Sequence, residues 1–137
     1  MLDRLSPKRI IVLSSAPQIR YPDCYGIDMA KLGDFIAFNA VIELLKDNNQ
    51  EDFIEKIYQK CKYQEDFKKE DMKNYVKEIY KTFSAEEIST KIAELLKPKN
   101  STAEVIIIYQ SIKDLHLSCP NHTGDWYFTG DYPTPGG

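Results

Sequence analysis

The chain has 137 residues, of which 42% are hydrophobic and 28% are charged, and its formal net charge is −3. This length suits one domain with a buried core, and the composition excludes wholesale disorder. The slightly negative charge argues against a nucleic-acid binder, and no apolar run reaches the roughly 18–20 residues that cross a bilayer. Three cysteines argue against a disulfide framework, and the first residues lack the apolar centre of a signal peptide. We therefore expect a cytoplasmic protein that binds neither nucleic acid nor a membrane.

The first predicted element is a buried strand at residues 9–15, where apolar, largely β-branched residues follow one another. Residues 16–28 contain two prolines and a glycine, so we expect a loop that leaves the carboxyl end of this strand. From residue 29 to residue 47, apolar side chains recur at spacings of three and four. This spacing predicts a helix, with Asp28 as its N-cap.

The middle of the chain is rich in charged residues and predicts three short amphipathic helices. Two apolar stripes at helical spacing fall within residues 53–61 and 72–83. Ser84 and Glu87 form a capping box that opens the third helix, which Pro98 ends. We expect these helices to form a small subdomain.

The last part of the chain begins with a second strand of the buried type, at residues 104–109. A short helix follows, with Ser111 as its cap and Asp114 in its first turn. The tail after residue 118 is rich in turn residues and aromatics, and we expect it to pack on the rest of the chain. The fold class is therefore α/β. Two strands cannot make a parallel sheet that is covered on both faces, so we expect further strands from another chain or from more of the natural polypeptide.

The loop at residues 16–28 is the predicted functional site, because ligands bind outside the carboxyl ends of the strands in open α/β sheets. It offers Arg20, Tyr25 and Asp28. An arginine can bind a phosphate or a carboxylate through two hydrogen bonds. The alternative is that Arg20 pairs with Asp23 or Asp28 and only fixes the loop.

Two separate stretches resemble one known family. The pattern S-x-A-P-x-I-R-x-P-x-x-Y-G-I-D-M at residues 14–29 resembles the segment after the phosphoribosyl-pyrophosphate loop of amidophosphoribosyltransferases. The stretch F-T-G-D-Y-P-T at residues 128–134 resembles the C-terminal F-T-G-x-Y-P-T of the same family. The matching parts cover about residues 8–45 and 103–135, and the helical middle looks like an insertion.

The resemblance implies the C-terminal part of a type I phosphoribosyltransferase fold, an α/β fold with few parallel strands in this part and a small helical subdomain inserted. Residues 1–47 would supply a strand, a loop and a helix, and residues 48–100 the insertion. Residues 101–137 would supply the second strand, a short helix and the aromatic tail.

The family is a glycosyltransferase of nucleotide metabolism that catalyses the first step of purine biosynthesis. It takes ammonia from glutamine and displaces pyrophosphate from phosphoribosyl pyrophosphate, with magnesium present, to give phosphoribosylamine. The resemblance gives a pocket-shaping, substrate-binding role to four matching residues: Arg20, Tyr25, Gly26 and Asp28. The parent enzyme's partners would be phosphoribosyl pyrophosphate, glutamine, the remainder of its own polypeptide and further copies in a homo-oligomer.

The chain lacks the two motifs that carry out the family's chemistry. The family's N-terminal cysteine nucleophile has no counterpart, because the chain starts Met1-Leu2 and its first cysteine is Cys24. No hydrophobic strand with an acidic pair and a Gly-Thr-rich turn occurs either. We therefore expect a C-terminal domain fragment that contains no catalytic residue and is inactive as an isolated chain. The alternative is a non-catalytic helical interaction or oligomerisation module built on residues 48–100; a third possibility is an α/β domain whose motif match is accidental.

The sequence contains the partial ligand sets of two metal centres, and neither centre is expected. Some family members hold an iron–sulfur cluster through four cysteines, whereas this chain has three, and one of them, Cys61, falls in the inserted helices. The pattern His116-x-x-Cys119-x-x-His122, followed by Asp125, contains zinc-type ligands. Its turn-rich surroundings favour coincidence, so we expect no metal site in this chain.

Overall fold

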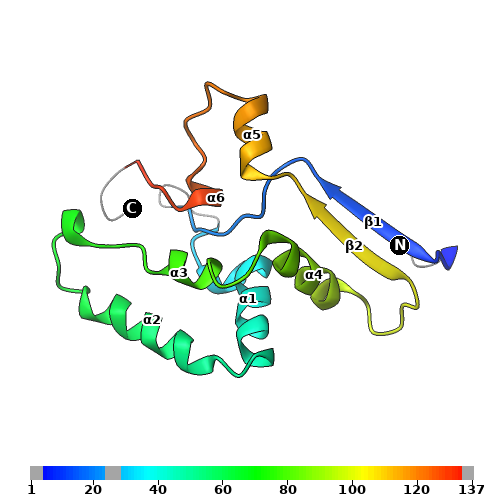
Figure 1. Cartoon of the computed structure of the whole chain (residues 1–137), viewed down its shortest axis with the longest axis horizontal. Coiled ribbons are helices and arrows are strands. Elements are labelled where there is room, and N and C mark those ends of the chain that lie inside the picture. Colours follow the sequence, from blue (N-terminus) through cyan, green and yellow to red (C-terminus); the bar gives the residue numbers. More distant parts are fainter. Residues whose placement is uncertain (1–4, 24–28, 134–137) are drawn as a thin grey trace.

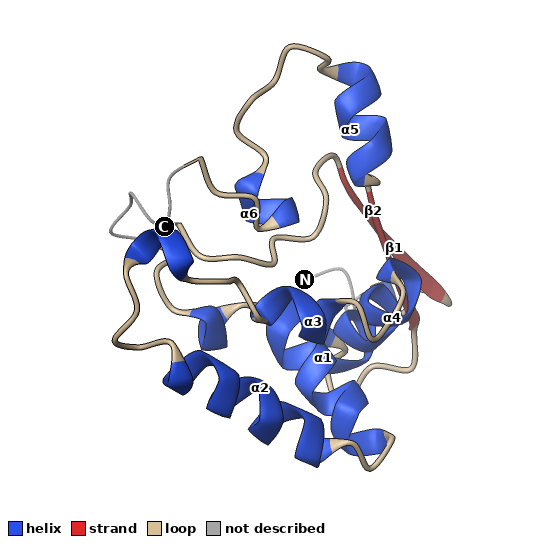
Figure 2. Ribbon diagram, turned by 60° about the vertical axis from the view of Figure 1, so that its left-hand side comes forward, coloured by secondary structure: helices blue, strands red, loops and turns tan. Residues whose placement is uncertain are grey.

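The computed structural model describes residues 5–23 and 29–133 and has a mixed α/β fold (Figures 1 and 2). The two apolar runs form strands β1 (Arg9–Ser14) and β2 (Glu104–Tyr109). They pair in parallel, with Arg9 opposite Glu104 at one end and Ser14 opposite Tyr109 at the other. The prediction of two parallel strands is confirmed. A crossover that contains most of the helices connects them.

The sheet has one covered face and one open face, because successive side chains of a strand point to opposite sides. Ile107 of β2 lies on the covered face, against α4, and is 8% exposed, whereas its neighbour Val12 of β1 on the same face is 45% exposed. On the opposite face Ile11, Leu13 and Ile108 are 53%, 73% and 51% exposed. The prediction that both strands are fully buried is therefore wrong within this chain, since no second layer covers the open face of the described sheet.

Helix α1 (Ile36–Asp47) begins seven residues later than the sequence pattern predicts. Met29 has a φ of +60°, which no helical residue adopts, and a short 3-10 helix, η2 (Leu32–Asp34), precedes α1. Phe35 has an extended backbone and is the N-cap of α1. The predicted cap, Asp28, lies outside the described residues.

The middle of the chain is helical, as predicted. It contains α2 (Glu51–Tyr63), η3 (Lys69–Asp71), α3 (Val76–Tyr80) and α4 (Ala85–Leu96). The capping box of α4 is confirmed: the Glu87 backbone N–H donates to Ser84 Oγ over 3.1 Å, and the Ser84 backbone N–H donates to Glu87 Oε2 over 2.7 Å. These bonds satisfy two N–H groups that the start of a helix leaves without partners.

The core lies where α4 crosses α1 and β2. The largest fully buried side chains come from α1 and α4 alone: Val41, Leu45, Ile88 and Ile92. Ile107 of β2 belongs to the same cluster. The last helix of the predicted insertion therefore shares one hydrophobic core with the elements that flank that insertion.

Two short helices follow β2. Ser111 caps α5 (Ile112–Ser118) as predicted, because its hydroxyl oxygen accepts the Asp114 backbone N–H over 3.0 Å. Helix α6 (Trp126–Thr129) ends at Gly130, and the tail returns to the loop after β1 (Figure 2). Among the described residues, no helix has the length and apolar character needed to span a membrane.

Candidate functional site

The site begins where β1 ends. The Ser14 hydroxyl donates to the carbonyl oxygen of Ala16 over 2.9 Å, and its oxygen accepts the Ala16 backbone N–H over 3.3 Å. This local turn, followed by Pro17, ends the strand because proline cannot donate to a ladder. The loop then runs past the start of α4 (Figure 1).

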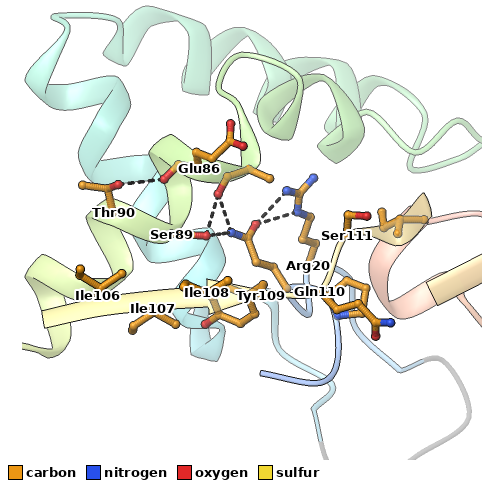
Figure 3. A pocket seen from close by; sticks show the side chains of 14 residues that line it. Arg20, Glu86, Ser89, Thr90, Ile106, Ile107, Ile108, Tyr109, Gln110 and Ser111 are labelled. Carbon is orange, nitrogen blue, oxygen red and sulfur yellow. Dashed lines mark hydrogen bonds between the residues drawn. The ribbon is translucent and has the colours of Figure 1, made fainter. Parts of the chain in front are cut away.

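Gln18 fixes the loop to α4. Its side chain is 3% exposed, and its amide nitrogen donates to the carbonyl oxygen of Ala85 over 2.9 Å and to Ser89 Oγ over 2.8 Å. Its amide oxygen accepts both Nε and Nη2 of Arg20, over 3.2 and 2.8 Å. Figure 3 shows this chain of bonds from α4 to the guanidinium. A buried amide needs such partners, so Gln18 holds Arg20 in one orientation.

Arg20 is also held by the aromatic ring of Tyr80, which Tyr21 contacts in turn. Its Cζ lies 5.4 Å from the centroid of the Tyr80 ring, and the Tyr80 hydroxyl donates to the Arg20 carbonyl oxygen over 2.9 Å. The ring of Tyr21 contacts that of Tyr80 edge-on, at 5.3 Å between centroids. Burial lowers the pKa of Arg20, raises the pKa of Tyr80, and raises that of Tyr21 to about 12. Both phenols therefore stay protonated near neutral pH and act as fixed parts of the site.

The C-terminal tail lies directly against this loop. The backbone N–H groups of Arg20 and Tyr21 both donate to the carbonyl oxygen of Tyr127, over 2.8 and 3.1 Å. The Tyr132 hydroxyl donates to the carbonyl oxygen of Pro22 over 2.6 Å. Two segments more than a hundred residues apart in sequence are therefore hydrogen-bonded side by side.

Gly130 makes this contact possible. Its φ is +71°, in the left-handed region that favours glycine. A Cβ at this position would lie 2.8 Å from Tyr21 Cε1 and 2.9 Å from Asn74 Nδ2. The glycine of the F-T-G stretch thus lets the tail approach the Tyr21 ring.

Only one of the four predicted site residues can be placed. Arg20 lies in the site, and its guanidinium interacts with Gln18 and Tyr80. Tyr25, Gly26 and Asp28 lie outside the described residues.

Sequence reasoning missed the side chains that hold Arg20. Gln18 is one polar residue in a proline-bounded loop, and no pattern marks it as buried. Tyr80 falls on an apolar helical stripe that indicates only packing, although its hydroxyl bonds the loop. Their proximity depends on how α3 and α4 pack against the loop, which the local sequence does not encode.

The histidine and cysteine pattern near the tail makes a polar link. His116 Nε2 lies 2.8 Å from Asp125 Oδ2, which connects α5 to the residue that precedes α6. Within residues 5–23 and 29–133, no three His, Cys, Asp or Glu side chains gather as a metal-binding group would.

A pocket of about 520 Å³ opens beside Gln18 and Arg20. One wall is the first half of α4, with Glu86, Ser89 and Thr90. The other is β2 and the residues that follow it, up to the start of α5 (Figure 3). The pocket lies toward the carboxyl end of β2, where open α/β sheets bind ligands.

No protein-family model matches this chain, and neither the curated proteins nor the solved structures contain a match to it. Its function is therefore inferred from its residues and geometry.

Proposed function

We propose that the chain forms the C-terminal part of the phosphoribosyltransferase domain of an amidophosphoribosyltransferase, with the loop after β1 bordering the phosphoribosyl pocket. The observation that carries the proposal is the contact between the two stretches that resemble this family. Tyr132 bonds Pro22, and Gly130 packs against Tyr21. β1 and β2 are parallel, so the segments that follow them leave the same edge of the sheet, and the contact places both stretches where one pocket could be shared.

The open face of the sheet also supports this proposal. Ile11, Leu13 and Ile108 place an apolar surface in solvent, which is unusual for strands of a parallel sheet. In a complete type I phosphoribosyltransferase fold, further strands and helices of the parent polypeptide would cover that surface. The parent enzyme would supply the nucleophile that releases ammonia. It would also supply the loop that binds phosphoribosyl pyrophosphate with magnesium. This parent enzyme would be a cytoplasmic homo-oligomer.

In this proposal Arg20 is a positioning residue. Its guanidinium is fixed by Gln18 and Tyr80, so it holds the loop in shape and needs no direct contact with the reacting atoms. Its backbone also carries one of the bonds to the tail.

The coding sequence on both sides of this segment tests the proposal most directly. We expect the reading frame to continue upstream into a hydrophobic strand, two acidic residues and a Gly-Thr-rich turn, with an N-terminal cysteine further back. An in-frame stop codon shortly before Met1 in the mature transcript would overturn the proposal.

Enzyme assays test the proposed activity. The isolated chain should make no phosphoribosylamine from phosphoribosyl pyrophosphate with glutamine or ammonia, whereas the full-length product should. In the full-length enzyme, Arg20→Met should raise the KM for phosphoribosyl pyrophosphate more than it lowers kcat, because the loop loses its shape. Lys81→Met, at an exposed lysine outside the loop, is the matched control. Turnover by the isolated chain, or a full-length product without turnover, would contradict the proposal.

A further inference from the structure

The pocket between α4 and β2 has the properties of a small-molecule site, and this inference does not rest on the proposed function. Its volume of about 520 Å³ falls within the range of ligand pockets in proteins, roughly 300–1,000 Å³. One wall comes from α4, which lies outside both stretches that resemble the family. In the view of Figure 3 the residues of β2 lie along the base, and Arg20 stands above Tyr109 and Gln110, next to Ser111.

Arg20 brings to this pocket hydrogen-bond donors that no described residue engages. A guanidinium has five N–H groups. Nε–H and one N–H of Nη2 donate to Gln18, and the remaining three have no acceptor among the described residues. The Gln18 bonds and the Tyr80 ring fix the plane of the group, so these donors are oriented before a ligand arrives. A fixed guanidinium that is partly removed from water favours an anion that can accept two parallel hydrogen bonds.

The remaining lining selects the type of anion. Arg20 is the one cation among the lining residues, and Glu86 adds a negative charge to the same pocket. A polyanion would therefore be poorly neutralised. Ile107 and Tyr109 of β2 point to the α4 side and offer apolar surface to the body of a ligand, whereas Ile106 and Ile108 line the pocket from the other side of the strand.

We propose that this pocket binds a monocarboxylic acid with a small apolar body, with its carboxylate on Arg20 and its body against β2. The single negative charge of the carboxylate would be neutralised by the single guanidinium of Arg20. The apolar body of the ligand would pack on the apolar side chains of β2. The hydroxyl groups of Ser89 and Thr90 are engaged with α4 itself, so Arg20 is the main polar anchor.

Titrations of the 137-residue chain with three probes test this binding. Hexanoate, its neutral analogue hexanamide and inorganic phosphate are followed through the backbone amide NMR signals. We expect hexanoate to give saturable shifts that include Arg20, Ser89 and residues 106–109. Hexanamide should bind at least about tenfold more weakly, because it lacks the charge-assisted bonds. Equal binding of hexanoate and hexanamide, tighter binding of phosphate, or no saturable shift with hexanoate would overturn the proposal.

Two variants test the Arg20 guanidinium and the pocket volume separately. Arg20→Met should weaken hexanoate binding about ten- to hundredfold, which is the loss expected for a hydrogen-bonded charge. Thr90→Phe fills the pocket from the α4 side and leaves Arg20 and Gln18 in place, so it tests the site even if Arg20→Met fails to fold. Lys81→Met, outside the pocket, should bind like the wild type. Unchanged hexanoate affinity in folded Thr90→Phe would overturn the proposal.

Discussion

Gly130 is a single position at which backbone conformation and space both require glycine. An alanine there would need a φ of +71° and a Cβ within 2.9 Å of two neighbouring side chains. We expect Gly130→Ala to lower the free energy of unfolding by about 1–3 kcal/mol, because the tail must shift away from Tyr21. Chemical denaturation followed by circular dichroism measures this change.

The matched control is Gly33→Ala. A Cβ at Gly33 would meet no atom within 4 Å, and its φ is not in the left-handed region. We expect a change of less than about 0.5 kcal/mol in the free energy of unfolding. Equal effects of the two substitutions would show that the tail does not pack on the loop as described.

At the same residue scale, sequence reasoning found Arg20 and missed its partners. An arginine in a proline-bounded loop after a strand is a recognisable candidate because its chemistry is specific. The role of Gln18 depends on its meeting Ala85 and Ser89, nearly seventy residues away. Such a contact follows from tertiary packing, so no local pattern predicts it.

At the scale of elements, the start of α4 gives a pH-dependent prediction. Hydrogen bonds from Ser84, first from its backbone N–H and then from its side chain, lower the pKa of Glu87 in the folded state. Stability from a lowered carboxyl pKa is present above the unfolded-state pKa and is lost as the pH falls through the folded-state pKa. We expect Glu87→Gln to have a slightly lower Tm than the wild type near pH 7. The difference should shrink as the pH falls below the ordinary glutamate range and through the lowered folded-state pKa of Glu87, because the carboxyl group is then protonated.

Glu86→Gln is the control, because it removes a charge from the same turn without removing a hydrogen bond to the Ser84 backbone. Thermal unfolding of both variants across this pH range should show a smaller change for Glu86→Gln near neutral pH. A Tm difference for Glu87→Gln that persists unchanged in acid would contradict the assigned cause.

The elements with strong local signals could be predicted and those that depend on context could not. The capping box at Ser84 and the strand at residues 104–109 have short-range causes, and the structure confirms both. The start of α1 was predicted too early, because the apolar spacing continues into a segment where Met29 has a left-handed backbone. Full burial was also wrong for both strands within this chain, because burial depends on neighbours that an apolar run cannot specify.

At the scale of the whole molecule, the dominant feature is the imbalance between the two faces of the sheet. The core of α1 and α4 covers one face along β2, while the other face presents Ile11 and Leu13 to solvent. Exposed apolar surface on proteins is found at contacts with other proteins, membranes or ligands. Under the proposed function, the rest of the parent polypeptide would make that contact.

The surface itself can be tested in the isolated chain with the double variant Ile11→Thr, Leu13→Thr. Threonine keeps the preference for strand while removing apolar area, and the replaced side chains are already 53% and 73% exposed. We expect the fluorescence of a hydrophobic dye such as ANS to fall by roughly half, with a change in unfolding free energy below about 1 kcal/mol. Ile107 is on the covered face and 8% exposed, so Ile107→Thr should instead lower the free energy of unfolding by about 1–3 kcal/mol. The ANS fluorescence of this variant should stay at the wild-type level. The reverse pattern would mean that the two faces of the sheet have been assigned the wrong way round.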